Sequence, residues 1–421
     1  MLRPIGFITI LLLFLSAGLV NAAGEEVLSW GDCITEALKN HPDLASAAAK
    51  LKQVEIDKTL AQSAMLPQIT SQVSGKTAKS ATAQADSYAY SLTGEQLLFD
   101  GFKAGHQVSA ASQTIRAQEY NYILASSDIR LNLRAAFVEL LKAQELVPIT
   151  EEITKRRKQN QELVRLRYEA GREHNGALLR AEADFAQAEL EKTQAERNLT
   201  FSQRQMIKEL GRREFTPVRV KGGFNIQSAD RDRPDFDYLA DNTPFLKELI
   251  AKKEAARFNL DSAKADFFPQ VYLNTSAGKT DSNWPPDNDV WSAGVTLSFP
   301  IFEGGSRISE LSKAHAALEQ KQAEERSGRD SVLLTLEETW TNLQDAIGEV
   351  LVKEKHLAAV EERARIAGAQ YSSGLISFDD WIIIEDNLIN TRKSFLNVRA
   401  DALVAEAAWI QAKGGALDYE N

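Results

Sequence analysis

The chain contains an internal duplication with a period of about 200 residues, and this repeat limits the folds that it can adopt. The tripeptide LPQ at 66–68 returns as FPQ at 268–270, and FDG at 99–101 returns as FEG at 302–304. Three further pairs keep this register: His41-Pro42 with Thr243-Pro244, Tyr168 and Gly171 with Tyr371 and Gly374, and Gly211 with Gly414. We therefore predict two copies of one structural unit, at 24–211 and 241–415, with a linker at 212–240 and a tail at 416–421.

The amino terminus has the parts of a secretory signal peptide. Arg3 precedes an apolar run at 5–20, and small residues follow at Ala22 and Ala23. We predict a signal peptide at 1–23 that is removed after Ala22 or Ala23. The alternative is a membrane anchor, but the run is shorter than the roughly 20 residues that a spanning helix needs. Because no later stretch has 18 consecutive apolar residues, an exported chain of this kind can enter a membrane only as a β-barrel.

Composition excludes several classes of protein. The 421 residues carry a formal net charge of −10, which argues against a nucleic-acid partner. Cys33 is the only cysteine, so the chain is not a disulfide scaffold. Only 23 glycines and 11 prolines interrupt the chain, and long helices are therefore expected.

Residues between each proline and the following FDG or FEG motif alternate in polarity. Trp291, Val295 and Leu297 are interleaved with Ser292 and Thr296. A period of two predicts strands with one apolar and one hydrated face. We expect β-hairpins at 68–99 and 270–300, with strands of about 10 or 11 residues, which is long enough to cross hydrocarbon at a tilt.

The remaining segments predict helices. The long segments 101–170 and 304–373 would each extend about 105 Å as a helix. Apolar residues recur every seven positions in the second, including Leu336 and Leu343, which is typical of coiled-coil packing. In the first copy this pattern ends in Thr154 and Gln161, so we expect that half to be less tightly buried. Shorter helices are predicted at 32–65, broken at His41-Pro42, and at 244–267, with return helices at 175–210 and 378–413.

Four strands per chain cannot close a barrel, and open strand edges are not tolerated in lipid. Several chains must therefore pool their hairpins, and three chains would supply twelve strands. Both ends of each predicted hairpin lead into helices, so all helices lie on one side of the membrane. That side is the periplasm of an exported protein.

Several motifs together resemble one known family. They are LSWGDCITEALKNHPDL at 28–44, the prolines before the hairpins, the FDG and FEGG turns, and YSSGLISFDD at 371–380. Their order resembles the outer membrane efflux protein (OEP) family of TolC-like channels over essentially the whole mature chain. The resemblance implies an α+β membrane protein, a homotrimer whose 12-stranded outer-membrane β-barrel continues into a long periplasmic α-helical barrel.

The same resemblance implies a function and partners. Such a protein is the exit duct of a tripartite efflux pump or a type I secretion system in the outer membrane of a Gram-negative bacterium. It contacts outer-membrane lipid and a periplasmic membrane-fusion adaptor, and through the adaptor an inner-membrane pump of the RND, ABC or MFS type.

In that architecture the turns between the long helices and the return helices are periplasmic tips that dock the adaptor. The resemblance makes these residues the candidate contacts: Tyr168, Gly171, Tyr371, Gly374 and Leu375. The alternative for the two tyrosines is that they only close the heptad seam. The first copy reads Arg172-Glu173-His174 after its glycine, so docking there would be more polar or would depend mainly on the second copy.

Asp379 and Asp380 lie just inside the second tip. By resemblance, Asp380 matches an aspartate that lines the closed periplasmic entrance, whereas Ile383 replaces a second family aspartate. Threefold symmetry would repeat Asp380 as an acidic ring that attracts cations. The alternative is an acidic first turn that only complements the helix dipole.

Enzyme activity is not indicated by the sequence. The histidines at 41, 106, 174, 315 and 356 have no metal-ligand spacing, and no catalytic or phosphate-binding motif occurs. We therefore expect no cofactor and no metal. The second functional hypothesis is a periplasmic coiled-coil scaffold that transports nothing.

Overall fold

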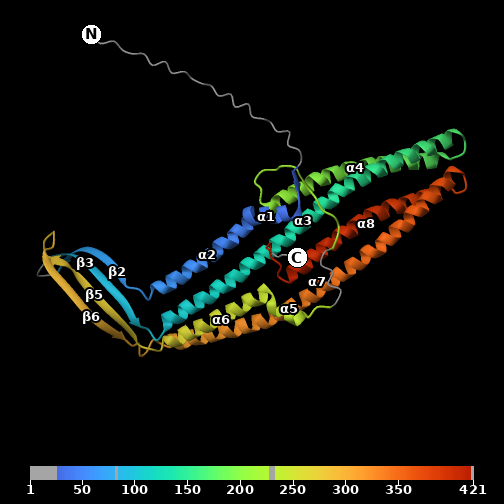
Figure 1. Ribbon diagram of the computed structural model, residues 1–421. Coiled ribbons are helices and arrows are strands. Elements are labelled where there is room, and N and C mark those ends of the chain that lie inside the picture. Colours follow the sequence, from blue (N-terminus) through green and yellow to red (C-terminus); the bar gives the residue numbers. More distant parts are fainter. Residues whose placement is uncertain (1–25, 81–83, 227–232, 419–421) are drawn as a thin grey trace, which may run out of the picture.

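A computed structural model describes residues 26–80, 84–226 and 233–418. The predicted signal peptide lies outside the described residues. Strands occupy one end of an elongated molecule, and long helices run from them to the opposite end (Figure 1). The first copy comprises α1 (Trp30–Asn40), α2 (Pro42–Ser63), β2 (Gln68–Lys79), β3 (Gln84–Phe99), α3 (Lys103–Glu169) and α4 (Asn175–Leu210). The second comprises α5 (Phe236–Asn242), α6 (Pro244–Ala265), β5 (Gln270–Asp281), β6 (Asn288–Ser298), α7 (Ser306–Ser372) and α8 (Phe378–Ala412).

Some boundaries differ from those predicted. The segment 212–240 is not only a linker, because it holds β4 (Val218–Val220), which pairs in parallel with β1 (Glu26–Leu28), and the start of α5. Strand β3 has 16 residues, more than the predicted 10 or 11. The tail at 416–421 is not free at its start, since Leu417 is buried and its backbone N–H donates to Ser126 Oγ at 3.1 Å.

The helices form a curved layer whose order follows the sheet. The sheet order is β2-β3-β5-β6. Near the sheet, α3 packs against α2 and α6, and α6 packs against α7. In the far half, α3 packs against α4 and α8, and α8 packs against α7. Helix α7 therefore forms one edge of the layer throughout, and α2 followed by α4 forms the other (Figure 1).

Helix α4 ends against the start of α2, and helix α8 ends against the start of α6, with a glycine at each junction. Gly211 ends α4 with a φ of 76°, and Gly414 follows α8 with a φ of 84°. A Cβ atom on Gly211 would lie 2.5 Å from the Asn40 carbonyl oxygen, and one on Gly414 would lie 2.3 Å from Pro244 Cδ. Glycine is required at both junctions because the backbone is left-handed and the next helix begins in contact with it.

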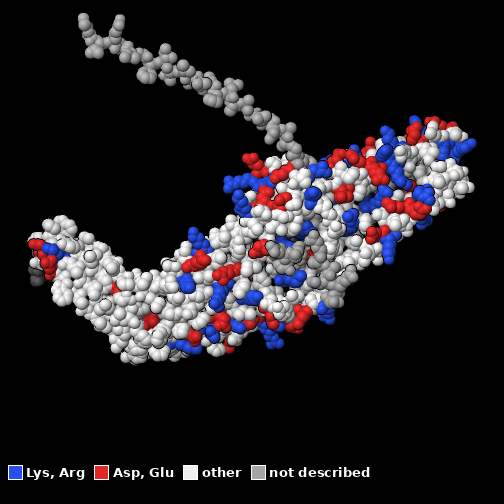
Figure 2. Space-filling model, in the orientation of Figure 1, with Lys and Arg blue, Asp and Glu red and all other residues white. Residues whose placement is uncertain are grey.

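The sheet has two chemically different faces. Paired residues on neighbouring strands share a face, and successive residues alternate between faces. The register therefore groups Val271, Leu273, Val295, Leu297 and Trp291 on one face, where Trp291 is 81% exposed. The other face carries hydroxyl and amide groups, including a hydrogen bond of 2.9 Å from Asn274 Nδ2 to Thr296 Oγ1. Figure 2 shows that charged side chains are dense along the helices and, over the sheet, gather at its outer rim.

The heptad seam differs between the copies. In α7, Leu336 and Leu343 are fully buried and pack with Trp409 of α8. In the far half of α3, the predicted positions Thr154 and Gln161 are half-buried. Buried positions there are instead Thr150, Ile153, Arg157 and Val164. The seam of the first copy thus moves to a neighbouring face of α3, and it includes a buried charge.

Candidate functional site

The two tips lie at the end of the molecule farthest from the sheet (Figure 1). Gly171 has a φ of 67° and Gly374 has a φ of 77°. At the first tip the N–H of Gly171 donates to the Tyr168 carbonyl at 2.9 Å, and the N–H of Arg172 donates to the Arg167 carbonyl at 2.8 Å. The second tip repeats this pattern. Both turns are therefore Schellman motifs, in which glycine allows the left-handed conformation that ends the helix.

The two equivalent tyrosines have different environments. Tyr371 has an exposed fraction of 0%, whereas Tyr168 is 40% exposed. The Tyr371 ring stacks on Trp381, with centroids 4.3 Å apart and an interplanar angle of 11°. Arg167 lies 4.5 Å from the centre of the same ring. Tyr371 thus supports the tip from within, and its side chain does not reach the surface. Tyr168 and Leu375 are exposed.

Hydrogen bonds connect the two tips within one chain. Tyr371 Oη donates to Glu173 Oε2 at 3.0 Å, and Arg167 Nη1 donates to the Tyr371 carbonyl at 2.8 Å. Burial, and then the hydrogen bond to Glu173, raise the pKa of Tyr371 above the usual tyrosine range. The phenol is therefore protonated at neutral pH and donates this bond. We call this set, Arg167, Glu173, Tyr371 and Trp381, the tip latch.

Asp379 and Asp380 are both exposed in the first turn of α8. Ser377 caps the helix by accepting the Asp380 backbone N–H at 3.1 Å, and its hydroxyl donates to Asp380 Oδ2 at 2.7 Å. Asp380 therefore has the helix-start role of the alternative hypothesis. It also begins an exposed stripe on α8 that continues through Ile383, Asn387 and Asn390.

A buried ionic layer lies one to two turns further along α8. Glu385 is 1% exposed and accepts hydrogen bonds from Arg156 Nε at 2.5 Å and Nη2 at 2.7 Å. The hydrogen bond to Glu385 raises the pKa of Arg156 above the usual arginine value. Arg157 pairs with Asp386, which Arg180 of α4 also contacts at 3.4 Å. These pairs join α3 and α4 of the first copy to α8 of the second, and periodicity did not indicate them.

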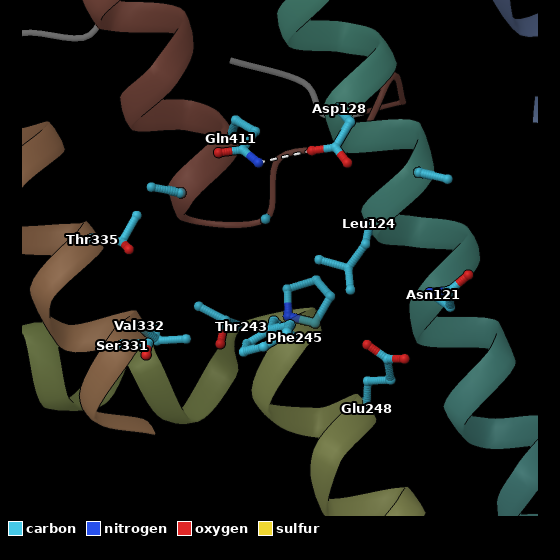
Figure 3. A pocket seen from close by; sticks show the side chains of 14 residues that line it. Asn121, Leu124, Asp128, Thr243, Phe245, Glu248, Ser331, Val332, Thr335 and Gln411 are labelled. Atoms are coloured by element: carbon cyan, nitrogen blue, oxygen red, sulfur yellow. Dashed lines mark hydrogen bonds between the residues drawn. The ribbon is translucent and has the colours of Figure 1, made fainter. Parts of the chain in front are cut away.

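A cavity of about 570 Å³ lies where α6 meets the end of α8 (Figure 3). The Glu248 carboxylate and the Phe245 ring line it, and Asp128 accepts a hydrogen bond from Gln411 at 2.9 Å. Among the described residues, no three His, Cys, Asp or Glu side chains are grouped so that they could hold a metal ion. None of the helices in the described part of the chain combines the length and hydropathy that membrane spanning requires.

The molecule thus combines a sheet that has one apolar face with two helices of 67 residues, α3 and α7, whose far ends close in tight turns. The chain belongs to the outer membrane efflux protein family, whose sequence profile matches residues 33–212 and 237–415. The two matched ranges correspond to the two copies. Membership places the protein in the outer membrane of a Gram-negative bacterium, among channels rather than enzymes.

Individual relatives agree with this membership. The outer membrane efflux protein BepC of Brucella suis is 23% identical over 409 residues, covering 94% of this chain and 86% of the relative. The outer membrane protein TolC of Vibrio cholerae is 22% identical, covering 96% of this chain and 94% of the relative. A crystal structure of CusC superimposes with a TM-score of 0.83 at 20% identity, covering 91% of each chain, and it supports the fold.

Proposed function

We propose that the protein is the exit duct of a tripartite efflux or type I secretion system, and that it works as a homotrimer. The observation that carries this proposal is a sheet with one apolar and one hydrated face. The order of its strands is matched by the order of the helices in the layer that continues from it. A sheet with an apolar face and a hydrated face fits a wall between lipid and a water-filled path.

The edges of the layer support the proposed trimer. Within the described residues, β2 and β6 each pair on one side only. Unpaired edges are costly in a membrane, so β6 of one copy pairs with β2 of the next. The same contact places α7 beside α2 and α4 of the neighbour. This interface joins two different surfaces, and such an interface forms a ring when the rotation between neighbouring copies closes. In the proposed trimer, three copies supply twelve strands.

The far tips serve as the periplasmic entrance and the docking site for an adaptor. Leu375, Tyr168 and the turns at Gly171 and Gly374 offer an exposed surface for the adaptor's helical hairpins. The tip latch supports this surface and keeps the entrance closed. The inner-membrane pump, of the RND, ABC or MFS type, acts through the adaptor and supplies the energy.

Membrane fractionation and planar-bilayer recording test the proposed function. The full-length protein should appear in the outer-membrane fraction as trimers and should conduct ions across a bilayer. A chain recovered outside the outer membrane, without conductance, would favour the periplasmic scaffold.

The proposed entrance ring makes a separate prediction. Three copies of Asp380 would attract cations at the narrowest point. Asp380→Ala is therefore expected to reduce cation selectivity and to weaken block by divalent cations about tenfold, because two or three carboxylates around one ion bind it much more tightly than bulk water does. Bilayer conductance with and without a divalent cation measures this, with Asp401→Ala, further along α8, as the control. An unchanged block profile leaves Asp380 with its capping role alone.

A further inference from the structure

The two copies cap equivalent helices with different side chains. His174 begins α4, and its Nδ1 accepts the Ala177 backbone N–H at 3.1 Å. Ser377, which lies 203 residues later, begins α8 and uses its hydroxyl in the same way. A second pair of equivalent helices shows the same difference: His41 caps α2 in the first copy, and Thr243 caps α6 in the second. The first copy thus uses an imidazole where the second uses a hydroxyl.

An imidazole cap depends on pH, and a hydroxyl cap does not. Neutral histidine can accept a hydrogen bond at Nδ1, but the imidazolium carries hydrogens on both nitrogens and cannot accept. Protonation therefore removes the capping bond. It also places a positive charge at the helix N-terminus, where the backbone dipole disfavours cations. Histidine is the side chain that undergoes this change between about pH 5 and 8.

The surroundings of His174 connect its charge to the tip latch. The side chain is 66% exposed, so protons reach it, and its Nε2 lies 4.0 Å from Glu173 Oε1. The other oxygen of Glu173 accepts the Tyr371 hydrogen bond and lies 3.9 Å from Arg167 Nε. Arg172, which precedes Glu173 in the same turn, is a cation like Arg167. Among these groups, Glu173 is the one that an imidazolium attracts, and it is the latch residue that holds Tyr371.

We propose that His174 is a pH-sensitive cap of the first tip. At mildly acidic pH the imidazolium loses its hydrogen bond from the Ala177 N–H and draws Glu173 away from Tyr371. Both changes weaken the first tip. The Ser377 cap does not change, so the second tip stays closed. Given the proposed duct function, the periplasmic entrance opens more readily at mildly acidic pH.

Hydrogen exchange of the full-length solubilised protein tests the cap without any need for transport. Exchange of 175–181 is compared with exchange of 378–384 in the same sample, at about pH 7.5 and about pH 5.5, on either side of the usual histidine pKa. The ratio cancels the intrinsic pH dependence of exchange. In the wild type it is expected to rise about fivefold on acidification, the factor that corresponds to losing one helix cap. A wild-type ratio that does not change with pH overturns the proposal.

Two variants separate the histidine from other titrating groups. His174→Ser copies the cap of the second repeat, and His174→Asn supplies another cap that does not titrate. Both should fold, and both should hold the exchange ratio constant between the two pH values. If the ratio still rises in either variant, another group causes the effect and the proposal fails.

Bilayer conductance then separates the cap from the proposed function. Acidification should raise the open probability of the wild type and leave His174→Ser unchanged. If the exchange ratio depends on pH but neither protein conducts ions, the proposed duct function is contradicted and the proposal for the His174 cap still holds. Conductance with equal pH dependence in both proteins would contradict the link from the cap to the entrance.

Discussion

Replacing Arg156 by methionine is expected to destabilise the far half of the helical layer by about 3–5 kcal/mol. Glu385 is 1% exposed and receives two hydrogen bonds from Arg156. Methionine keeps the apolar stem of the side chain but leaves a buried carboxylate without its partner. The free energy of unfolding from guanidinium titration of the solubilised protein measures the loss.

Arg392→Met is the matched control for this prediction. Arg392 bonds to Glu152 and Glu361, which are both exposed carboxylates. Surface pairs contribute about 0–1 kcal/mol, so this variant should stay close to the wild type. Equal losses in the two methionine variants would show that burial of Glu385 has no special role. Adding Glu385→Gln to Arg156→Met should restore part of the stability.

Replacing Trp381 by alanine is expected to open the tip latch. The indole is buried and stacks on Tyr371, and removing a buried tryptophan typically costs about 3–5 kcal/mol. Tyr371 would then lose its ring contact while its bond to Glu173 faces solvent. We expect the Trp381→Ala variant to have a higher bilayer conductance than the wild type, with the same oligomeric state as the wild type on electrophoresis.

Two controls accompany this second prediction. Trp381→Phe retains an aromatic ring. Among the residues that the structure describes, the buried indole N–H has no hydrogen-bond partner to lose, so conductance should change little. Ile383→Ala truncates an exposed neighbour two residues away. If Ile383→Ala raises conductance as much as Trp381→Ala, the stacked ring is not what closes the tip.

Much of the fold could be predicted because its signals are local. Alternation around Trp291 indicates a two-faced strand, and the proline motifs mark where helices give way to strands. Because the chain is duplicated, each of these local patterns occurs once in each copy. The boundaries that were missed, such as α5 within the predicted linker and the length of β3, depend on contacts with segments far away in the chain.

The site was predicted less completely. Tyr168 and Tyr371 are equivalent in the sequence repeat, yet only Tyr371 is buried. Glu173 was noted as a departure from the second copy, but its bond to Tyr371 joins residues 198 positions apart. No periodicity indicates such a pair, because periodicity reports the face of one helix and not its partner.

The sequence by itself determined that the chain has two copies, each with a hairpin between helices, and which strand face is apolar. Those properties follow from hydrogen bonding and side-chain spacing within each segment. Only the tertiary structure decided that Arg156 meets Glu385, that the two tips are latched together, and that α4 and α8 continue α2 and α6 in line. Each of these depends on which helix faces rotate toward one another, and that choice is made by packing the whole layer at once.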